Sequence, residues 1–359
     1  MLKAVHIIGG LDLGGAEVLV RDLHKKWDKP FESHIMYHTD GKLLNGADEK
    51  SKKFTFNKLK LSTIRALRAY IRHNEIDIIH VHSVVNPLKL IPALVFSKVK
   101  TVFSVHGYSL NSRKFTKWIA FSFFDSVLFV SNTLKNAYIG NSASSKDKFR
   151  VLHNGIESAK FNIKSDRFRS ELSIPINRML MGFVGNFNTV RDQLTVCKAL
   201  KLLKENGIDF TFLFVGAAHI QKLYDECFNY CKEQGLLENV KFLGSRNDVP
   251  EILSSLDLFV YSSNHDTFGI AVVEAMMSET PVVVNDLNVF TEITDGGRYA
   301  CLYKSKDEAD LAREIEKLIQ NPDERKSLGL KGKKWAEDNF SIEAHIDQLN
   351  ELYSDLLQK

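Results

Sequence analysis

The chain has 359 residues, 44% of them hydrophobic and 26% charged, which predicts two domains with cores of their own. It contains no apolar run of about 18 residues, so no membrane-spanning helix is predicted, and its short N-terminal apolar stretch differs from a signal peptide. Residues 1–160 hold 25 Lys+Arg against 13 Asp+Glu, net +12, and the remainder holds 23 against 31, net −8. The basic half indicates an anionic surface or substrate, but the absence of nucleic-acid-binding motifs predicts no nucleic-acid partner.

A strand, a glycine loop and a helix are predicted at the start of the chain. Residues 2–8 are mostly apolar and form the predicted strand, and Gly14 and Gly15 end the loop. The next segment has apolar residues on one helical face: Val18, Leu19, Leu23 and Trp27. Glycines allow a backbone to approach a ligand, with the helix N-terminus directed at it. The spacing is not G-x-G-x-x-G, and a tight turn without a ligand is the alternative.

Three nearly continuous apolar runs predict further strands of a parallel sheet covered on both faces: residues 77–82, 100–106 and 127–131. His106 ends the second run, at the sheet edge where ligands bind, and either contacts a ligand or caps a loop. His80 and His82 alternate along a strand and therefore face the same side. They are expected to be structural or to line an acceptor site, because no third ligand for a metal is apparent.

Two basic segments account for the charge of the first half. Residues 50–72 hold eight lysines and arginines interspersed with leucines and isoleucines, and residues 113–124 place three cations beside Trp118 and several phenylalanines. A basic helix with an aromatic face suits a membrane interface, where each cation near anionic lipid contributes about 1 kcal/mol. The alternative is that the aromatic residues are core and the cations form a solvated rim.

The second half follows a polar stretch, residues 157–177, that is predicted to cross between domains. A new sheet starts with the strand 178–186, which ends in Gly185 and Asn186, and Arg191 follows shortly after. Arg191 is a candidate phosphate ligand or, alternatively, a solvated residue at a helix start. Strands and helices continue to alternate through residues 210–216 and 239–244, with Arg246 in the next loop.

Residues 256–284 form a strand, a turn, a helix and a buried strand. The turn contains Asp266, the helix covers residues 269–277, and Pro281 precedes the last strand. Glu274 lies among apolar residues of this helix, and burying a carboxylate without a partner is costly. The hydroxyls of a ribose or a sugar ring would be suitable partners; the alternative is an ordinary surface glutamate.

The order acid-x-Phe-Gly-x4-Glu-Ala-Met, followed by a Thr-Pro-Val-Val strand, resembles the E-x7-E signature of retaining glycosyltransferases of family 4. Asp266 is the first acid, where the family more often has Glu. The resemblance implies a GT-B fold: two Rossmann-like, doubly wound parallel-sheet domains that face a cleft. It also implies that the C-terminal helix, residues 341–358, packs back on the N-terminal domain.

The resemblance also assigns roles to residues. It implies that Glu274 binds the ribose hydroxyls of a nucleotide-sugar and that His106 and Asp266 lie near the donor sugar, with the backbone at Thr267, Phe268 and Gly269. Gly14 and Gly15 match the N-terminal glycine loop near the diphosphate, Gly185 matches a loop glycine, and Arg246 lies in the loop beside the base. The family's Gly-Arg and Lys that neutralise the diphosphate are here Gly185-Asn186 and Arg191, so one cation is missing.

The sequence predicts three parts: an acceptor-binding domain (1–160), a donor domain (161–340) and a returning helix (341–359). The predicted function is transfer of a sugar from a nucleotide-sugar, a UDP-sugar in the first instance, to a glycan or lipid-linked acceptor in cell-surface polysaccharide synthesis. A sugar-nucleotide epimerase of the same fold is one alternative. A non-catalytic, membrane-associated sugar-nucleotide-binding subunit is the other, favoured by Asn186.

The expected location is the cytoplasm, since the four cysteines are sparse and form no metal pattern. The basic aromatic segment adds the anionic inner face of a membrane as a candidate surface. No Asp-x-Asp motif stands out at a strand edge, and we therefore expect transfer without a metal or another cofactor.

Overall fold

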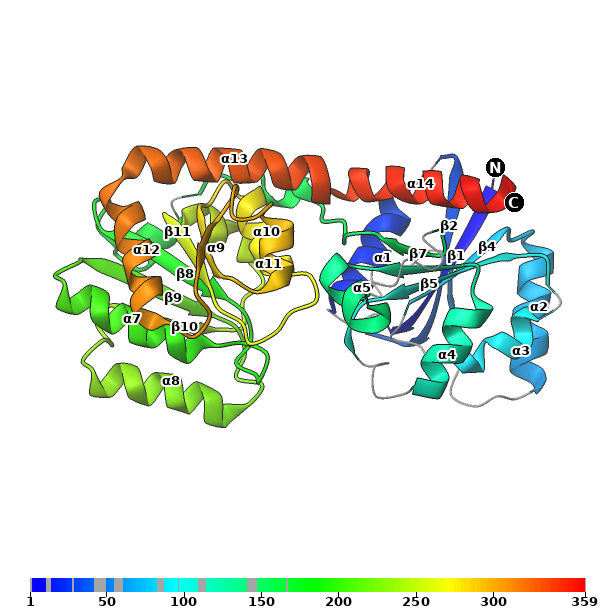
Figure 1. Cartoon of the computed structure of the whole chain (residues 1–359), viewed down its shortest axis with the longest axis horizontal. Helices are drawn as coiled ribbons and strands as arrows, with labels where there is room; N and C mark the ends of the chain where they lie inside the picture. The colour runs from blue at the N-terminus through cyan, green and yellow to red at the C-terminus, as the bar shows by residue number, and fades with distance from the viewer. Residues whose placement is uncertain are drawn as a thin grey trace. The chain divides into compact units, whose positions relative to one another are not determined.

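The computed structural model describes residues 2–10, 14–27, 29–41, 50–54, 61–82, 87–95, 97–108, 114–140, 147–165 and 167–358 (Figure 1). The chain divides into two compact units, one formed by residues 1–156 with 342–359 and the other by residues 157–341. These divisions lie within four residues of the expected positions, 160/161 and 340/341. Each unit is a parallel sheet with helices on its faces, which confirms the predicted fold class.

Within the described residues, seven parallel strands of the first unit pair in the order β3-β2-β1-β4-β5-β6-β7. The strands are β1 (Leu2–Gly10), β2 (Phe31–Thr39), β3 (Ser51–Lys53), β4 (Ile78–His82), β5 (Lys100–Val105), β6 (Ser126–Phe129) and β7 (Phe149–Val151). The order reverses its direction between β1 and β4, the arrangement of a doubly wound sheet. Apolar side chains of these strands are buried, as the continuous apolar runs predict.

The helices of the first unit are α1 (Gly15–Lys26), α2 (Leu61–His73), α3 (Ile91–Leu94), α4 (Lys114–Phe123), α5 (Asn132–Ile139) and α14 (Ile342–Gln358), with a 3₁₀ turn at Pro87–Lys89. The C-terminal helix α14 joins this core, as predicted: Trp27 Nε1 donates to Asn350 Oδ1 at 2.9 Å, and the rings of Trp27 and Tyr353 stack with centroids 5.5 Å apart. Burial of this apolar face holds the helix against α1 and β1.

The second unit is also a doubly wound sheet, and six parallel strands of its described residues pair in the order β10-β9-β8-β11-β12-β13. They are β8 (Met179–Val184), β9 (Phe210–Val215), β10 (Val240–Gly244), β11 (Leu258–Tyr261), β12 (Val282–Asn285) and β13 (Cys301–Tyr303). Counted from β8, this is the order 3-2-1-4-5-6 of a classical dinucleotide-type sheet. The reversal falls between β8 and β11.

The helices of the second unit are α6 (Arg167–Glu171), α7 (Gln193–Glu205), α8 (Gln221–Glu233), α9 (Val249–Ser255), α10 (Ile270–Met277), α11 (Asn288–Ile293), α12 (Glu308–Gln320) and α13 (Pro322–Phe340), with a 3₁₀ turn at Ser158–Phe161. Local sequence sets several of their ends: Asp192 accepts from the N–H of Thr195 and caps α7, and Asp307 accepts from the N–H of Asp310 and caps α12. The four cysteines are free thiols.

The structure differs from the sequence prediction in the first unit. Strands β2 and β3 were not predicted, because polar residues such as His34 interrupt the apolar run of β2; that imidazole is satisfied by the Tyr70 hydroxyl at 2.8 Å. Lys52 and Lys53 lie in β3 rather than in a helix.

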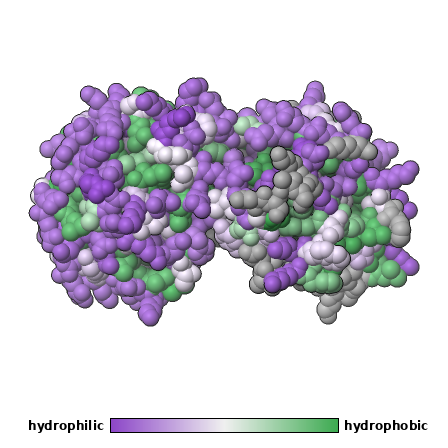
Figure 2. Space-filling model, in the orientation of Figure 1, coloured by the Kyte–Doolittle hydropathy of each residue, from purple (hydrophilic) through white to green (hydrophobic). Residues whose placement is uncertain are grey.

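The predicted aromatic face is divided. Phe121 and Phe124 are buried, whereas the side chains of Phe115 and Trp118 are 69% and 65% exposed. Arg113 and residues 55–60 of the predicted basic segments lie outside the described residues. Figure 2 shows hydrophobic surface interspersed with hydrophilic surface on both units. None of the described helices is long and apolar enough to span a bilayer.

Candidate functional site

The reversal of strand order in the second unit places two loops at one sheet edge. β8 and β11 are paired neighbours, with Phe259 beside Gly182. In sheets of this order, ligands bind at the carboxyl ends of the two strands that flank the reversal. Residues 185–191 follow β8 and residues 262–269 follow β11, so the topology gathers most of the residues that the sequence assigns to the donor.

Arg191 and Asp266 form an ion pair at this edge, although 75 positions separate them in the sequence. Nη1 of Arg191 donates to Asp266 Oδ2 at 2.9 Å and to Ser263 Oγ at 3.0 Å, and the guanidinium lies 5.1 Å from the centroid of the Tyr261 ring. Nε and Nη2 of Arg191 have no hydrogen-bond partner among the described residues. The guanidinium is therefore held along one edge and keeps donors for an anion along the other.

The turn after β11 depends on Asp266 and Gly269. Oδ1 of Asp266 accepts from the backbone N–H of Thr267 at 2.7 Å and of Phe268 at 3.3 Å, while the Phe268 side chain is buried in the core. Gly269 has φ +90°, and a Cβ at this position would lie 2.7 Å from a ring carbon of Phe290. Both the left-handed conformation and the lack of space require glycine where α10 begins.

Glu274 lies on α10, and its carboxyl group makes no hydrogen bond or ion pair with any residue that the structure describes. Burial raises the pKa of this carboxyl to about 7, and the positive charge of Lys160 opposes the shift only in part. Lys160 belongs to the 3₁₀ turn Ser158–Phe161, which packs on α10. A ligand that donates hydrogen bonds would stabilise the ionised form of this carboxyl.

The Asn186 side chain holds two loops together. Its Oδ1 accepts from the backbone N–H of Ala217 at 2.8 Å. The loops after β8 and β9 also approach closely at Gly216, where a Cβ would lie 2.2 Å from the carbonyl oxygen of Gly185. An arginine at position 186 would lose the hydrogen bond to Ala217, so the residue that departs from the family pattern has a structural role here.

Arg246, predicted near the nucleotide base, is engaged by neighbours in its own loop. Its Nε and Nη2 donate to the two carboxylate oxygens of Asp248 at 2.9 and 2.7 Å, and its guanidinium lies 5.3 Å from the centroid of the Phe168 ring. The guanidinium also lowers the pKa of the Asp248 carboxyl. This bidentate pair leaves Arg246 less suited than Arg191 to replace the missing diphosphate cation.

The remaining predicted residues belong to the first unit. Gly14 is the N-cap of α1 and Gly15 its first residue. A Cβ on Gly14 would lie 2.1 Å from Glu17 Oε2, so the Glu17 side chain folds over this glycine. His106 follows β5, and its Nε2 lies 2.8 Å from Nδ1 of His82. Burial, reinforced by nearby His345, lowers the pKa of His106 to about 4.

The structure places a third histidine, His6, beside His80 and His82, which the sequence did not show; the prediction that they are structural or line an acceptor site stays a prediction. His6 of β1 is the register partner of His80, and the three imidazoles offer donor atoms within 4.8 Å of one another. Strand pairing brings them together across more than 70 positions, which the spacing of histidines within one strand cannot reveal. The predicted metal independence of the reaction stays a prediction.

Several residues at the donor-side edge were not found from the sequence. Tyr261 and Ser263 contact Arg191. The side-chain amide of Asn285 binds the Ser263 backbone twice: Oδ1 accepts from the N–H at 3.0 Å, and Nδ2 donates to the carbonyl oxygen at 2.9 Å. Lys160 lies in the stretch interpreted as a linker. The only signal for Ser263 and Asn285 was their position at the ends of apolar runs.

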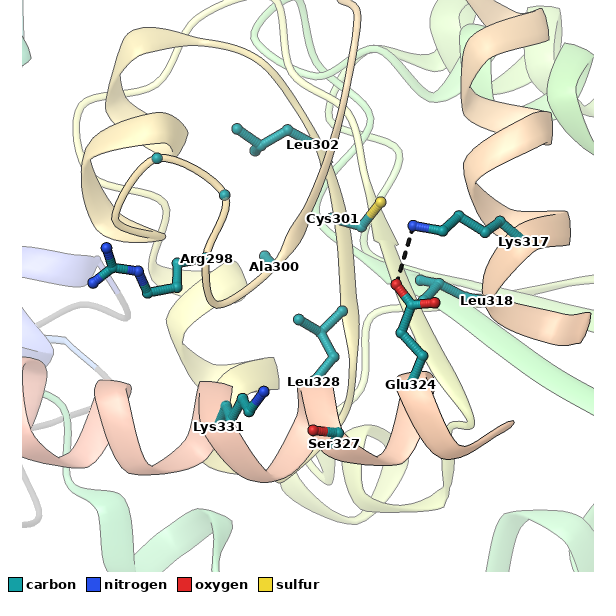
Figure 3. Close-up of a pocket in the computed structure, with 12 residues that line it drawn as sticks. Arg298, Ala300, Cys301, Leu302, Lys317, Leu318, Glu324, Ser327, Leu328 and Lys331 are labelled. Carbon is teal, nitrogen blue, oxygen red and sulfur yellow. Dashed lines mark ion pairs between the residues drawn. The ribbon is translucent and has the colours of Figure 1, made fainter. Parts of the chain in front are cut away.

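A separate hollow of about 420 Å³ lies between the loop before β13 and helices α12 and α13 (Figure 3). Arg298 and Lys331 line it together with Cys301, and an ion pair of 3.0 Å joins Lys317 to Glu324 at its side. None of the predicted donor residues is among the residues that line this hollow.

Two doubly wound parallel-sheet units and a returning C-terminal helix define a GT-B protein, and the comparisons with solved structures agree. The chain resembles a crystal structure of Anabaena Alr3699/HepE in complex with UDP and glucose, with a TM-score of 0.82 at 20% identity over 99% of this chain and 100% of that one.

Family models identify the class of enzyme. The model "Glycosyl transferases group 1" matches residues 164–335, and "Glycosyltransferase Family 4" matches residues 13–160. The chain is therefore a member of the group 1 glycosyltransferases, which confirms the resemblance and the predicted enzyme class, a glycosyltransferase of the hexosyltransferase type.

Two curated relatives cover most of the chain. One is UDP-Gal:alpha-D-GlcNAc-diphosphoundecaprenol alpha-1,3-galactosyltransferase of Escherichia coli, 25% identical over 99% of this chain and 97% of its own length. The other is the capsular polysaccharide biosynthesis glycosyltransferase CapM of Staphylococcus aureus, 22% identical over 75% of this chain and 74% of its own length.

Proposed function

We propose that the protein is a retaining glycosyltransferase that moves a hexosyl group from a UDP-sugar to a glycan or lipid-linked acceptor in the synthesis of a cell-surface polysaccharide. Relatives named for capsule synthesis and for a diphosphoundecaprenol acceptor support the acceptor class, and a structural neighbour that binds UDP and glucose supports the donor. The observation that carries the proposal is Glu274, a carboxyl without a described partner beside the edge where the strand order reverses.

Glu274 has the properties that a ribose-binding carboxylate needs. Two ribose hydroxyls would donate to it and supply the hydrogen bonds that its surroundings lack, which favours the ionised form. Glu274 lies on α10, and the turn just before α10 contains Asp266, the ion-pair partner of Arg191. The base and ribose are thus assigned to Arg246 and Glu274, and the diphosphate to Arg191.

Arg191 is proposed to bind the leaving diphosphate through Nε and Nη2, while Asp266 and Ser263 hold its Nη1 edge. A preorganised cation is most effective where negative charge develops, and in this reaction charge develops on the diphosphate. Asp266 and the backbone at residues 267–269 are assigned to the donor sugar. Gly14 and Gly15 are assigned to the diphosphate and acceptor, and Gly185 and Asn186 to the loop that supports Arg191.

For the chemical step we propose attack on the same face from which the diphosphate leaves. The bond from the anomeric carbon to the diphosphate oxygen breaks, the bond to the acceptor oxygen forms, and the acceptor's proton passes to the leaving phosphate. This course retains the anomeric configuration without a covalent intermediate on a carboxylate. His106 is proposed to hydrogen-bond a hydroxyl of the donor sugar.

The test of the donor site is thermal unfolding of wild type and Glu274→Ala against a panel of nucleotide-sugars. At about 100 times Kd, a donor stabilises the folded protein by about 2.7 kcal/mol. A shift with one UDP-sugar that disappears in Glu274→Ala supports the proposal. The absence of a shift with every nucleotide-sugar refutes it and favours a subunit without a donor site.

We also propose that α4 touches an anionic membrane. Phe115 and Trp118 are exposed and stack with centroids 6.4 Å apart on the same helix as Lys114 and Lys117. Exposed aromatic rings beside cations suit the interface of an anionic bilayer. Wild type should sediment with phosphatidylglycerol vesicles, and Phe115→Ala/Trp118→Ala should not.

Replacement of Ile176, which is 84% exposed in the other unit, by alanine is the matched control and should leave sedimentation unchanged. Equal sedimentation of wild type and the double variant would contradict the proposed membrane surface.

A further inference from the structure

On one face of the sheet in the first unit, the side chains are apolar near the start of the strands and mostly histidines near their carboxyl ends. Ala4, Ile78 and Val102 form its apolar part, beneath α1 and α14. Toward the carboxyl ends of the same strands, and on the same face, lie His6, His80, His82 and Ser104, followed by His106 just beyond β5. All four strand residues are buried, so each ring nitrogen there needs a partner within the protein.

Three of these histidines, His106, His82 and His6, are joined end to end in a histidine relay. His106 Nε2 lies 2.8 Å from His82 Nδ1, and His82 Nε2 lies 3.2 Å from His6 Nδ1. The histidine relay ends at Nε2 of His6, which is buried and makes no hydrogen bond within the described residues. His80 lies beside the relay, and both its nitrogens are hydrogen-bonded: Nδ1 with the Tyr353 hydroxyl and Nε2 with Ser104 Oγ, each at 2.7 Å.

A shared metal ion is the obvious alternative, and the ring geometry opposes it. The rings of His80 and His82 are stacked, with centroids 4.5 Å apart and planes 16° apart, and those of His6 and His82 differ by 26°. A ligating lone pair lies in the plane of its ring, so the stacked rings of His80 and His82 do not direct their lone pairs at one ion. The His80 nitrogens are, moreover, already bonded to hydroxyls.

These imidazoles are neutral at physiological pH. Burial lowers the pKa of His6 to about 3 and of His106 to about 4, and lowers that of His82 far below its ordinary value. The neighbouring imidazoles act in the same direction, including His24 of α1 and His345 of α14. No carboxylate is among the groups that affect these pKa values.

A neutral imidazole carries one proton, so each nitrogen-to-nitrogen hydrogen bond fixes the tautomer of the next ring. If His106 donates from Nε2, the protons run toward His6 and leave a buried N–H at its Nε2. If His6 donates from Nδ1, the protons run toward His106, whose Nε2 then accepts and whose Nδ1 carries the proton. The second arrangement leaves only a lone pair at His6 Nε2, and unpaired buried donors are the rarer of the two.

Asn154 favours the second arrangement as well. A side-chain hydrogen bond with Asn154 raises the pKa of His106, as an acceptor does, and Asn154 Oδ1 is buried with no other hydrogen-bond partner among the described residues. A proton on Nδ1 of His106 gives this oxygen a donor within reach. The opposite arrangement provides none.

We propose that His82 and His6 are positioning residues that hold His106 in the tautomer with its proton on Nδ1, so that His106 has one donor of fixed direction, which Asn154 accepts in the ligand-free protein and a hydroxyl of the donor sugar accepts when the donor is bound. This inference rests on the proposed function, which places His106 at the donor sugar. His80, tied to Tyr353 of α14, packs against the relay and keeps its rings in place.

The test compares two substitutions of nearly equal size at His82. Asparagine places an amide group where Nδ1 of histidine lies and can keep the bond to His106, whereas glutamine places one where Nε2 lies and keeps only the bond to His6. Full-length protein labelled with ¹⁵N-histidine should show His106 protonated on Nδ1 in wild type and His82→Asn. His82→Gln should show a mixture of tautomers and at least a tenfold lower kcat, with KM changed less than threefold.

Wild type alone also tests the inference, which covers the case in which a variant does not fold. Scalar coupling between His82 Nδ1 and His106 Nε2 across the hydrogen bond is expected. Three outcomes would overturn the inference. One is a His106 tautomer that is unchanged in His82→Gln, and another is the absence of this coupling. The third is stoichiometric Zn²⁺ uptake by wild type that is lost in His6→Phe. Wild-type turnover by His106→Ala would refute the proposed role of His106 at the sugar, while the spectra decide on the relay separately.

Discussion

Replacement of Glu274 by glutamine separates the stability of the protein from its binding of the donor. In the ligand-free protein, burial raises the pKa of Glu274 from 4.5 to about 7. Because the folded state then holds this proton more tightly than the unfolded state, the contribution of Glu274 to stability falls as the pH rises from about 4.5 to about 7. Glutamine has the same size and no charge, so it avoids this loss.

The magnitude follows from the shift. Because Glu274 is only half-buried, this shift corresponds to at most about 3 kcal/mol, at 1.36 kcal/mol per pKa unit. Residues 157–341 form a unit of 185 residues, in which each kcal/mol raises Tm by about 2–4 °C, so Glu274→Gln should unfold up to about 6–12 °C higher than wild type at pH 8. At pH 4.5 to 5 the two proteins should unfold at nearly the same temperature.

The assay is thermal unfolding from pH 4.5 to 8.5 with and without a UDP-sugar. Glu226→Gln, at an exposed position of α8, is the control and should match wild type throughout. With donor at 100 times Kd the difference should nearly close, because wild type gains about 2.7 kcal/mol, close to the advantage of the variant, and Glu274→Gln gains much less. Equal stability of the two proteins at pH 8 without ligand would refute the assigned burial, and equal stabilisation by the donor would refute the role in binding.

The remaining predictions concern the turn, the cation and the metal. Gly269→Ala should cost at least about 2 kcal/mol in urea unfolding, from the strain at φ +90° and the contact with Phe290, and a cost under about 0.5 kcal/mol would contradict the geometry. Arg191→Lys keeps the charge but loses the fork and should lower kcat/KM about 10- to 100-fold, whereas Arg298→Lys, 70% exposed, should not; equal rates would remove Arg191 from the site. Excess EDTA should leave the transfer rate unchanged, and a rate abolished by EDTA and restored by Mg²⁺ or Mn²⁺ would show that a metal is required.

The features that depend on near neighbours along the chain could be predicted from the sequence. Continuous apolar runs marked most strands, and Asp192 and Asp307 lie where helices begin. The spacing from Asp266 to Glu274, with the glycine that α10 requires, identified the family and supplied the candidate donor-site residues. These properties lie within one element and its flanks, where backbone geometry and hydrophobic periodicity act directly.

The contacts between groups that are distant in the sequence follow only from the folded structure. It paired Arg191 with Asp266, gave Asn186 the backbone of Ala217, and tied Arg246 to its own loop. It also raised the pKa of Glu274, since burial is set by everything that packs on a helix and not by the helix alone.

The histidines show the same division most clearly. The sequence placed His80 and His82 on one face of a strand. The parallel pairing of β1 with β4 puts His6 beside them, although more than 70 residues separate His6 from His80 in the sequence. Register follows from the packing of a whole sheet, so no local pattern contains it. The partners of a buried polar group are therefore a property of the fold, whereas the type of group at each strand end is a property of the sequence.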